Sequence, residues 1–237
     1  MSSADVPRGA PVSPEMLAYY GLGLEDERLD RDRGKLERWR TQELLARYLP
    51  PPPCVVLDVG GGTGRYAAWL AERGYTVHLI DPVPLHIEQA RARSTAQPHA
   101  PLASISPGDA RHLDWEADQA NAVLLLGPLY HLTSREERLA CLREAWRVLR
   151  PRGIVMAAAI SRFASALDPG FEDVRVLAIE GPGWLLQDFD AQWSDEHLRE
   201  IILEIVRRTE SEPALLGASS HLMAIGSKPR GGTALRS

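Results

Sequence analysis

Short hydrophobic runs alternate with amphipathic stretches along most of the chain. Continuous apolar runs predict buried strands at residues 54–59, 77–80, 102–105, 122–126 and 153–160. Apolar residues at helical spacing predict helices at 66–73 and 86–93, and a third helix that opens near Thr133 and has its apolar positions at Leu139, Leu142, Trp146 and Leu149. Strands that alternate with helices indicate an α/β fold with a doubly wound, mostly parallel sheet. Ligands of such sheets bind beyond the carboxyl ends of the strands.

The two ends of the chain depart from this alternation. Apolar positions at 36–49 predict a helix, which the prolines at 50–53 end. After a sixth strand that begins near Gly170, a helix at 195–209 and a last strand at 221–225 predict an antiparallel end to the sheet. We therefore expect a flexible N-terminus (1–14), an N-terminal helical cap (15–50), one α/β domain (51–228) and a flexible tail (229–237).

Two local features refine this outline. Thr133 and Glu136 have the spacing of a capping box at the start of the helix that follows the fourth strand. Residues 161–169 form a short connection between the fifth and sixth strands, where a parallel crossover usually needs a dozen or more residues. The second feature predicts an unusually open or rebuilt region beside that connection.

Composition and charge narrow the class of protein. The net charge of −5 is not typical of a protein that binds the phosphate backbone of a nucleic acid. The chain has no apolar run of the ~18 residues that a membrane span requires, and residues 1–16 lack an apolar signal core, so we expect a cytoplasmic protein. Cys54 and Cys141 occupy a predicted strand and a predicted helix, which favours buried thiols over a disulfide or a metal site.

The sequence VVLDVGGGTGRY at 55–66 places a glycine-rich turn between the first strand and the next helix. Such a turn lets a ligand approach the backbone, because glycine has no Cβ. The glycine spacing does not match the dinucleotide fingerprint G-x-G-x-x-G, and the turn lacks the lysine of a Walker A loop. Asp58, inside the strand, would repel a pyrophosphate and suits a ligand that is positively charged at that point.

Two further acids follow later strands. Asp81 ends the second strand, where an acid can accept from both ribose hydroxyls, and Asp109 follows the third strand, where it could accept from an adenine amino group. A cationic amino acid, a ribose and an adenine together describe S-adenosylmethionine.

The chain resembles the class I S-adenosylmethionine-dependent methyltransferases over about residues 36–180, and we expect the resemblance to continue to about residue 227. The matching motifs, in order, are LDVGGGTGRY (57–66), HLID (78–81), GDAR (108–111), GPLYHL (127–132) and VLRPRGIV (148–155). The resemblance implies a Rossmann-like fold, an N-terminal helical lid, and S-adenosyl-L-homocysteine as the product of the cofactor. It also implies cofactor roles for ten residues: Asp58, Gly60, Gly61 and Gly62 at the methionine end, Asp81 and Pro82 at the ribose and adenine, Asp109 and Ala110 at the adenine, and Leu126 and Gly127 closing the site.

The acceptor is less well defined. GPLY at 127–130 lies where base-methylating enzymes carry Asn/Asp-Pro-Pro-Tyr/Phe, so the polar acceptor for an exocyclic amine is missing. We therefore expect transfer to O or N of a small molecule, with no nucleic acid, membrane or metal involved. An RNA or protein methyltransferase and a non-catalytic cofactor-binding regulator stay as alternatives.

Several residues are candidates for the acceptor side. His131 is a candidate general base, with packing or helix capping as the alternative. Tyr20 is a candidate catalytic phenol, Tyr19, Tyr130 and Trp184 are candidate substrate contacts, and ordinary packing is the alternative for each aromatic residue. Trp193 is a further candidate wall of the site, again with core packing as the alternative. Three arginines, Arg38, Arg40 and Arg65, are candidate partners of a carboxylate on the cofactor or the substrate. For Arg38 the alternative is a solvated helix face.

Overall fold

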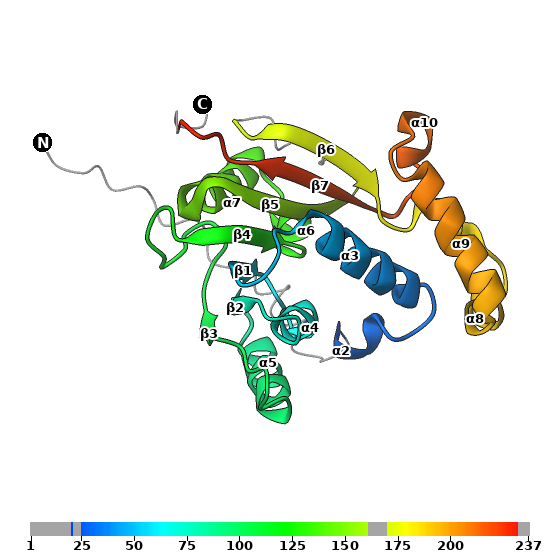
Figure 1. Cartoon of the computed structure of the whole chain (residues 1–237), viewed down its shortest axis with the longest axis horizontal. Coiled ribbons are helices and arrows are strands. Elements are labelled where there is room, and N and C mark those ends of the chain that lie inside the picture. The colour runs from blue at the N-terminus through cyan, green and yellow to red at the C-terminus, as the bar shows by residue number, and fades with distance from the viewer. Residues whose placement is uncertain (1–19, 21–24, 161–169, 232–237) are drawn as a thin grey trace, which may run out of the picture.

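A seven-stranded sheet forms the centre of the molecule (Figure 1). This computed structural model describes residues 20, 25–160 and 170–231. The strands lie in the order β3-β2-β1-β4-β5-β7-β6. β7 runs antiparallel to both of its neighbours, and the other pairs are parallel. The bounds are β1 Val55–Val59, β2 Thr76–Asp81, β3 Ser104–Pro107, β4 Ala120–Leu125, β5 Leu149–Ile160, β6 Glu172–Ala178 and β7 His221–Ser227.

Helices cover both faces of this sheet (Figure 1). They include α2 Glu25–Arg28, α3 Gly34–Tyr48, α4 Arg65–Ala71, α5 Pro84–Ala96, α6 Pro128–His131, α7 Arg135–Val148, α8 Phe189–Ser194, α9 Glu196–Thr209 and α10 Pro213–Leu216, with a 3-10 helix, η2, at Gly181–Leu185. The observed architecture confirms the predicted Rossmann-like α/β fold with an antiparallel last strand.

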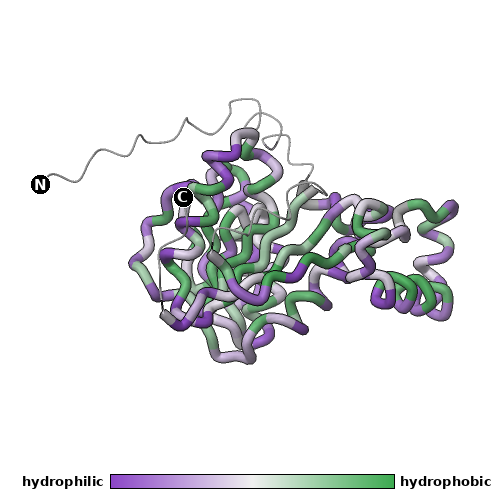
Figure 2. The backbone as a smooth tube through the Cα atoms, turned by 90° about the horizontal axis from the view of Figure 1, so that it is seen from above, coloured by the Kyte–Doolittle hydropathy of each residue, from purple (hydrophilic) through white to green (hydrophobic). Residues whose placement is uncertain are grey.

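Alternating side chains on the central strands build two hydrophobic layers. On β4, Leu124 points to the layer formed with α3, α4 and α5, and Leu125 to the layer formed with α7. Both residues are fully buried, as expected for parallel strands covered on two faces. Figure 2 shows the same result, because the hydrophobic stretches of the tube gather in the strands.

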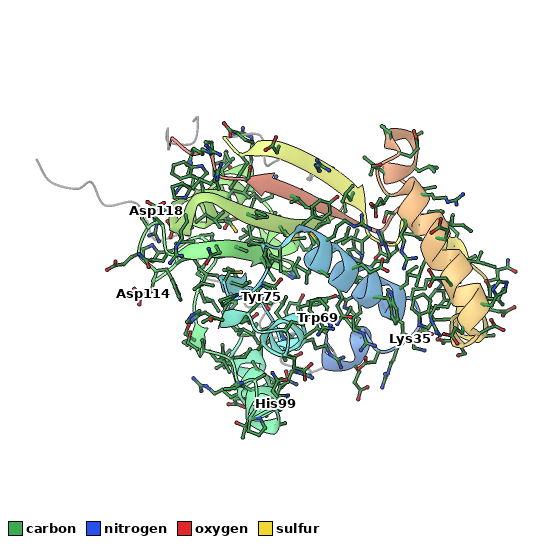
Figure 3. The ribbon with its side chains drawn as sticks, viewed as in Figure 1. Lys35, Trp69, Tyr75, His99, Asp114 and Asp118 are labelled. Carbon is green, nitrogen blue, oxygen red and sulfur yellow. The ribbon has the colours of Figure 1, made fainter. Side chains whose placement is uncertain are left out.

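A third, smaller cluster holds α8 and α9 beyond the edge of the sheet (Figure 1). Leu36 of α3 packs there with Phe189, Trp193 and residues of α9. Lys35, labelled in Figure 3, forms an ion pair with Asp190 at 2.6 Å. α3 therefore belongs to the main core through its later turns and to this extension through its first turn.

The predicted strands and longer helices match the structure, with differences at their ends, whereas the short elements α2, η2, α8 and α10 were not predicted. β5 begins at Leu149, four residues before the predicted start at 153. Of the predicted N-terminal cap, 15–19 and 21–24 lie outside the described residues, as do the short connection at 161–169 and most of the tail. The domain boundaries stay predictions. In the described part of the chain, no helix combines the length and the apolar character needed to cross a membrane.

The predicted capping box at Thr133 and Glu136 is wrong by one residue. Ser134 is the N-cap of α7, and its hydroxyl accepts from the Glu137 backbone N–H at 3.1 Å. Glu137 in turn accepts from the Ser134 backbone N–H. Both pairs have the same three-residue spacing, so the pattern in the sequence fitted either register.

Ser134→Ala is expected to destabilise the protein by about 1 kcal/mol, because it removes the N-cap acceptor of a 14-residue helix. Thr133→Ala, one residue earlier, is the matched control and should change stability by only a few tenths of that amount. Urea unfolding of both variants measures the difference. Equal effects, or a larger effect at Thr133, would contradict the observed register.

Candidate active site

A cavity of about 570 Å³ opens at the carboxyl ends of β1, β2 and β4. This is the place where the strand order changes direction, and where ligands of doubly wound sheets bind. All ten residues predicted to hold the cofactor line it: Asp58, Gly60, Gly61, Gly62, Asp81, Pro82, Asp109, Ala110, Leu126 and Gly127. The acceptor candidates Tyr20, Tyr130 and His131 line the same cavity.

The glycine turn is fixed against the end of β2. The Gly60 backbone N–H donates to the Ile80 carbonyl at 2.7 Å, and the Gly62 N–H donates to Asp81 Oδ2 at 2.8 Å. Gly60 has a φ of 69°, and a Cβ there would lie 2.6 Å from Pro128 Cγ. A side chain at Gly60 would therefore be strained in conformation and would clash with the start of α6.

Asp58 lies at the floor of the cavity with no compensating partner. Its residue is 1% exposed, and neither carboxylate oxygen has a hydrogen-bond partner among the described residues. Burial, together with the nearby charge of Asp81, raises the pKa of Asp58 to about 7. A buried carboxylate in this state fits a ligand that brings a positive charge, such as the ammonium of an amino acid. The residue therefore suits the methionine end of S-adenosylmethionine.

Asp81 is bound on several sides by the protein itself. Besides the Gly62 bond, its Oδ1 accepts from the Val83 N–H at 2.9 Å and from His86 Nδ1 at 3.0 Å. His86 was not a sequence candidate, yet it is 4% exposed and lines the cavity. A signal for it existed, because His86 is a polar residue on the buried stripe of α5, one turn after the acid that ends β2.

Asp109 is held by an arginine that the sequence analysis did not single out. Arg111 donates to it from the guanidinium, at 2.6 Å for the shortest contact, and from the backbone N–H at 2.8 Å. Arg111 also pairs with Glu137 of α7 at 2.5 Å. Burial opposes ionisation of Asp109, but the bonds from Arg111 outweigh it and lower the pKa of this carboxyl. Asp109 lines the cavity as an oriented carboxylate, and its expected contact with adenine stays a prediction.

The two catalytic candidates, Tyr20 and His131, contact each other in the part of the cavity that Tyr130 also lines, here named the acceptor half after the predicted role of these residues. The Tyr20 hydroxyl lies 2.7 Å from His131 Nε2, although 111 positions separate the two residues in sequence. The Tyr20 ring contacts the edges of both His131 and His86, with centroid distances of 5.3 Å and 5.1 Å. Tyr20 therefore connects the half of the cavity lined by cofactor candidates with the acceptor half.

Charged and phenolic side chains complete the acceptor half. Arg28 of α2 and Glu37 of α3 form a two-bond ion pair, at 2.5 Å and 2.9 Å, on the cavity wall. Tyr66 and Tyr130 line the same wall. Burial, and then the negative charge of Glu37, raises the pKa of both phenols, so both stay protonated and available as hydrogen-bond donors.

Behind this wall, Glu180 and His221 form a second charged pair, with Glu180 Oε1 and His221 Nδ1 2.5 Å apart. Burial opposes both charges, but the hydrogen bond between the two groups outweighs it, so the pKa of Glu180 is lowered and that of His221 is raised. Among the described residues, Glu37, Glu180 and His221 are a group whose ligand atoms lie within 4.8 Å of one another, a separation that could suit a metal ion. Their carboxylates are occupied by Arg28, His221 and Ser219, so an ion-pair network describes the group.

The remaining candidates differ in their outcome. Tyr19 and the side chain of Trp184 fall outside what the structure describes. Trp193 is buried in the cluster below α9 and does not line the cavity, so its interpretation as a wall of the site is wrong. Arg40 is fully buried and paired with Glu43 and Glu210. Arg65 lines the cavity and pairs with Asp30 at 2.5 Å.

Asp58→Asn is expected to stabilise the ligand-free protein at about pH 8 by a few kcal/mol. Because the folded-state pKa is raised, the wild type loses stability as the pH rises from about 4 to about 7, and the loss is complete above that range. The stability gap between variant and wild type should therefore grow over this range and then level off. Urea unfolding at several pH values measures it. The same variant should bind S-adenosylhomocysteine more weakly.

Asp114→Asn, at an exposed carboxylate labelled in Figure 3, is the matched control and should change neither stability nor binding. A stability gap for Asp58→Asn that is independent of pH would show that the wild-type carboxylate carries no buried charge.

Comparison with known proteins agrees with this geometry. A methyltransferase domain model matches residues 56–153, which run from β1 to the start of β5. Methyltransferase GfsG of Streptomyces halstedii is 33% identical over 160 residues, which cover 65% of this chain and 56% of that protein. The ubiquinone/menaquinone biosynthesis C-methyltransferase UbiE of a Caulobacter species is 27% identical over 194 residues, covering 78% and 73%. The chain spans about half the length of the first curated relatives it matches, at 56%, 47% and 44%.

Solved structures show the same fold. The crystal structure of the cyclase SpnF superposes with a TM-score of 0.56 at 18% identity, covering 82% of each chain. The strand order, the glycine turn after β1 and the acid at the end of β2 agree with the sequence matches to methyltransferases. Residues 56–153 therefore match a methyltransferase domain, and the chain has the Rossmann-like fold found in S-adenosylmethionine-dependent methyltransferases.

Proposed function

We propose that this protein transfers a methyl group from S-adenosylmethionine to an oxygen or nitrogen of a small molecule. The observation that carries the proposal is that the ten predicted cofactor residues and the Tyr20–His131 pair line one cavity. Its volume of about 570 Å³ is in the range of small-molecule sites. The net charge of −5 favours a small molecule over RNA as acceptor.

The cofactor half offers a partner for each part of the donor. Asp58 would hold the ammonium group, Asp81 the ribose, and Asp109 with Ala110 the adenine. When bound, the cofactor supplies a methyl group that its sulfonium has already activated toward a nucleophile. The protein then has to orient the acceptor and remove its proton, and orientation alone can supply a large part of the acceleration.

The Tyr20–His131 pair favours an acceptor that loses a proton, such as a hydroxyl. A phenol can donate and accept at the same time, and a neutral imidazole nitrogen can accept. Tyr20 would take the proton of the acceptor hydroxyl while its own proton passes to His131 Nε2. The acceptor oxygen would keep the electron pair that forms the new bond to carbon.

Two relatives' names bear on this choice. UbiE is named as a C-methyltransferase of ubiquinone and menaquinone biosynthesis, which supports a small-molecule acceptor for a protein of this kind. SpnF, with the same fold, is named as a cyclase, so the fold alone does not fix the reaction.

The deciding experiment is incubation with isotopically labelled donor and a panel of alcohols, phenols and amines. Incorporated label supports the proposal, and rearranged products without label would favour a cyclase-type reaction.

Tyr20→Phe and His131→Ala are each expected to lower kcat by about a hundredfold or more on a hydroxyl acceptor, because the proton relay is broken. The affinity for S-adenosylhomocysteine in calorimetry should change by less than about threefold. Tyr75→Phe is the matched control and should behave as wild type, because this phenol, labelled in Figure 3, directly precedes β2 and does not line the cavity. Unchanged kcat in both site variants would give the pair a structural role only.

A further inference from the structure

His86 places a buried ring nitrogen, Nε2, at the wall of the cavity. Its side chain is 5% exposed, and its Nε2 makes no hydrogen bond to any described residue. The residue lines the cavity beside Asp81. A buried polar atom without a partner is costly and calls for a ligand or another explanation.

The chemical state of this nitrogen follows from its neighbour. Asp81 Oδ1 lies 3.0 Å from His86 Nδ1, and an ionised carboxylate can only accept. Nδ1 therefore carries the hydrogen, and in the neutral ring Nε2 is an acceptor with an available lone pair. His86 thus offers the cavity a hydrogen-bond acceptor.

Asp81 cannot satisfy a vicinal diol by itself. A carboxylate has about four acceptor sites. The Val83 N–H and His86 take the two on Oδ1, and the Gly62 N–H takes one on Oδ2. A ribose diol brings two donors to a carboxylate with about one site left. The second hydroxyl needs another acceptor on the same wall, and His86 Nε2 is one.

We propose that His86 is a nucleoside-binding residue: Asp81 Oδ2 and His86 Nε2 each accept one of the two ribose hydroxyls. The inference rests on the proposed use of S-adenosylmethionine and deepens it. The Tyr20 ring packs edge-to-face against the His86 ring, with the two ring centroids 5.1 Å apart. The sequence predicts that Asp81 accepts from both ribose hydroxyls. Because Asp81 already accepts from Gly62, Val83 and His86, we assign one of the two hydroxyls to His86 instead.

The test is calorimetric binding of S-adenosylhomocysteine to the full chain, in wild type and two variants. His86→Asn keeps an N–H near the position of Nδ1 and loses the Nε2 acceptor. His86→Gln keeps a polar group near the position of Nε2 and loses the donor to Asp81. We expect His86→Asn to weaken binding about tenfold. His99→Asn, at an exposed histidine after α5 labelled in Figure 3, is the matched control and should bind as wild type.

The 2′-deoxy and 3′-deoxy analogues of the same ligand identify the contact. In wild type, each deletion should weaken binding. In the His86→Asn variant, one of the two analogues should bind no more weakly than S-adenosylhomocysteine itself, because the variant already lacks the acceptor for the hydroxyl that this analogue has lost. Thermal unfolding without ligand checks that the variants fold.

Three outcomes overturn the proposal. Wild-type affinity in His86→Asn would show that Nε2 touches no ligand. Equal losses for both analogues in His86→Asn and wild type would show that His86 only positions Asp81, and in that case His86→Gln should be the weaker binder. If S-adenosylhomocysteine binds the wild-type protein with a dissociation constant above about 1 mM, both the proposed function and this inference are wrong.

Discussion

The close contact between the glycine turn and the end of β2 is the constraint on which the rest of the site depends. Two backbone N–H groups of the turn donate to Ile80 and Asp81, which fixes the positions of β1, β2 and the start of α4 relative to one another. Pro128 fills the space where a Cβ of Gly60 would lie, so α6 also takes its place from this turn. His131, at the end of α6, is thereby carried to the cavity.

Much of the fold and of the cofactor half could be predicted, because the signals are local. The strand runs, the glycine turn and the acids at 58, 81 and 109 each lie within a few residues of the element that positions them. The buried state of Asp58 followed from its place inside an apolar run. Local patterns of this kind keep their meaning in the folded chain, since parallel strands bring their carboxyl ends to one edge.

The features that sequence reasoning missed depend on tertiary contacts. The contact between Tyr20 and His131 joins residues 111 positions apart, and nothing in either local sequence indicates it. His86 was hidden for another reason: a histidine on the buried stripe of a helix is more often a core residue than a ligand contact. The capping box was placed in the wrong register because two equivalent Ser/Thr and Glu pairs lie side by side at 133–137.

The pKa of Asp58, near 7, has a consequence for measurement. In neutral solution the ligand-free protein is a mixture of molecules with and without a proton on this carboxyl. A cationic ligand selects the ionised form, so its binding releases a fraction of a proton to the buffer. The heat recorded in calorimetry then contains the ionisation heat of the buffer, and titrations in two buffers of different ionisation enthalpy would count the protons exchanged at the floor of the cavity.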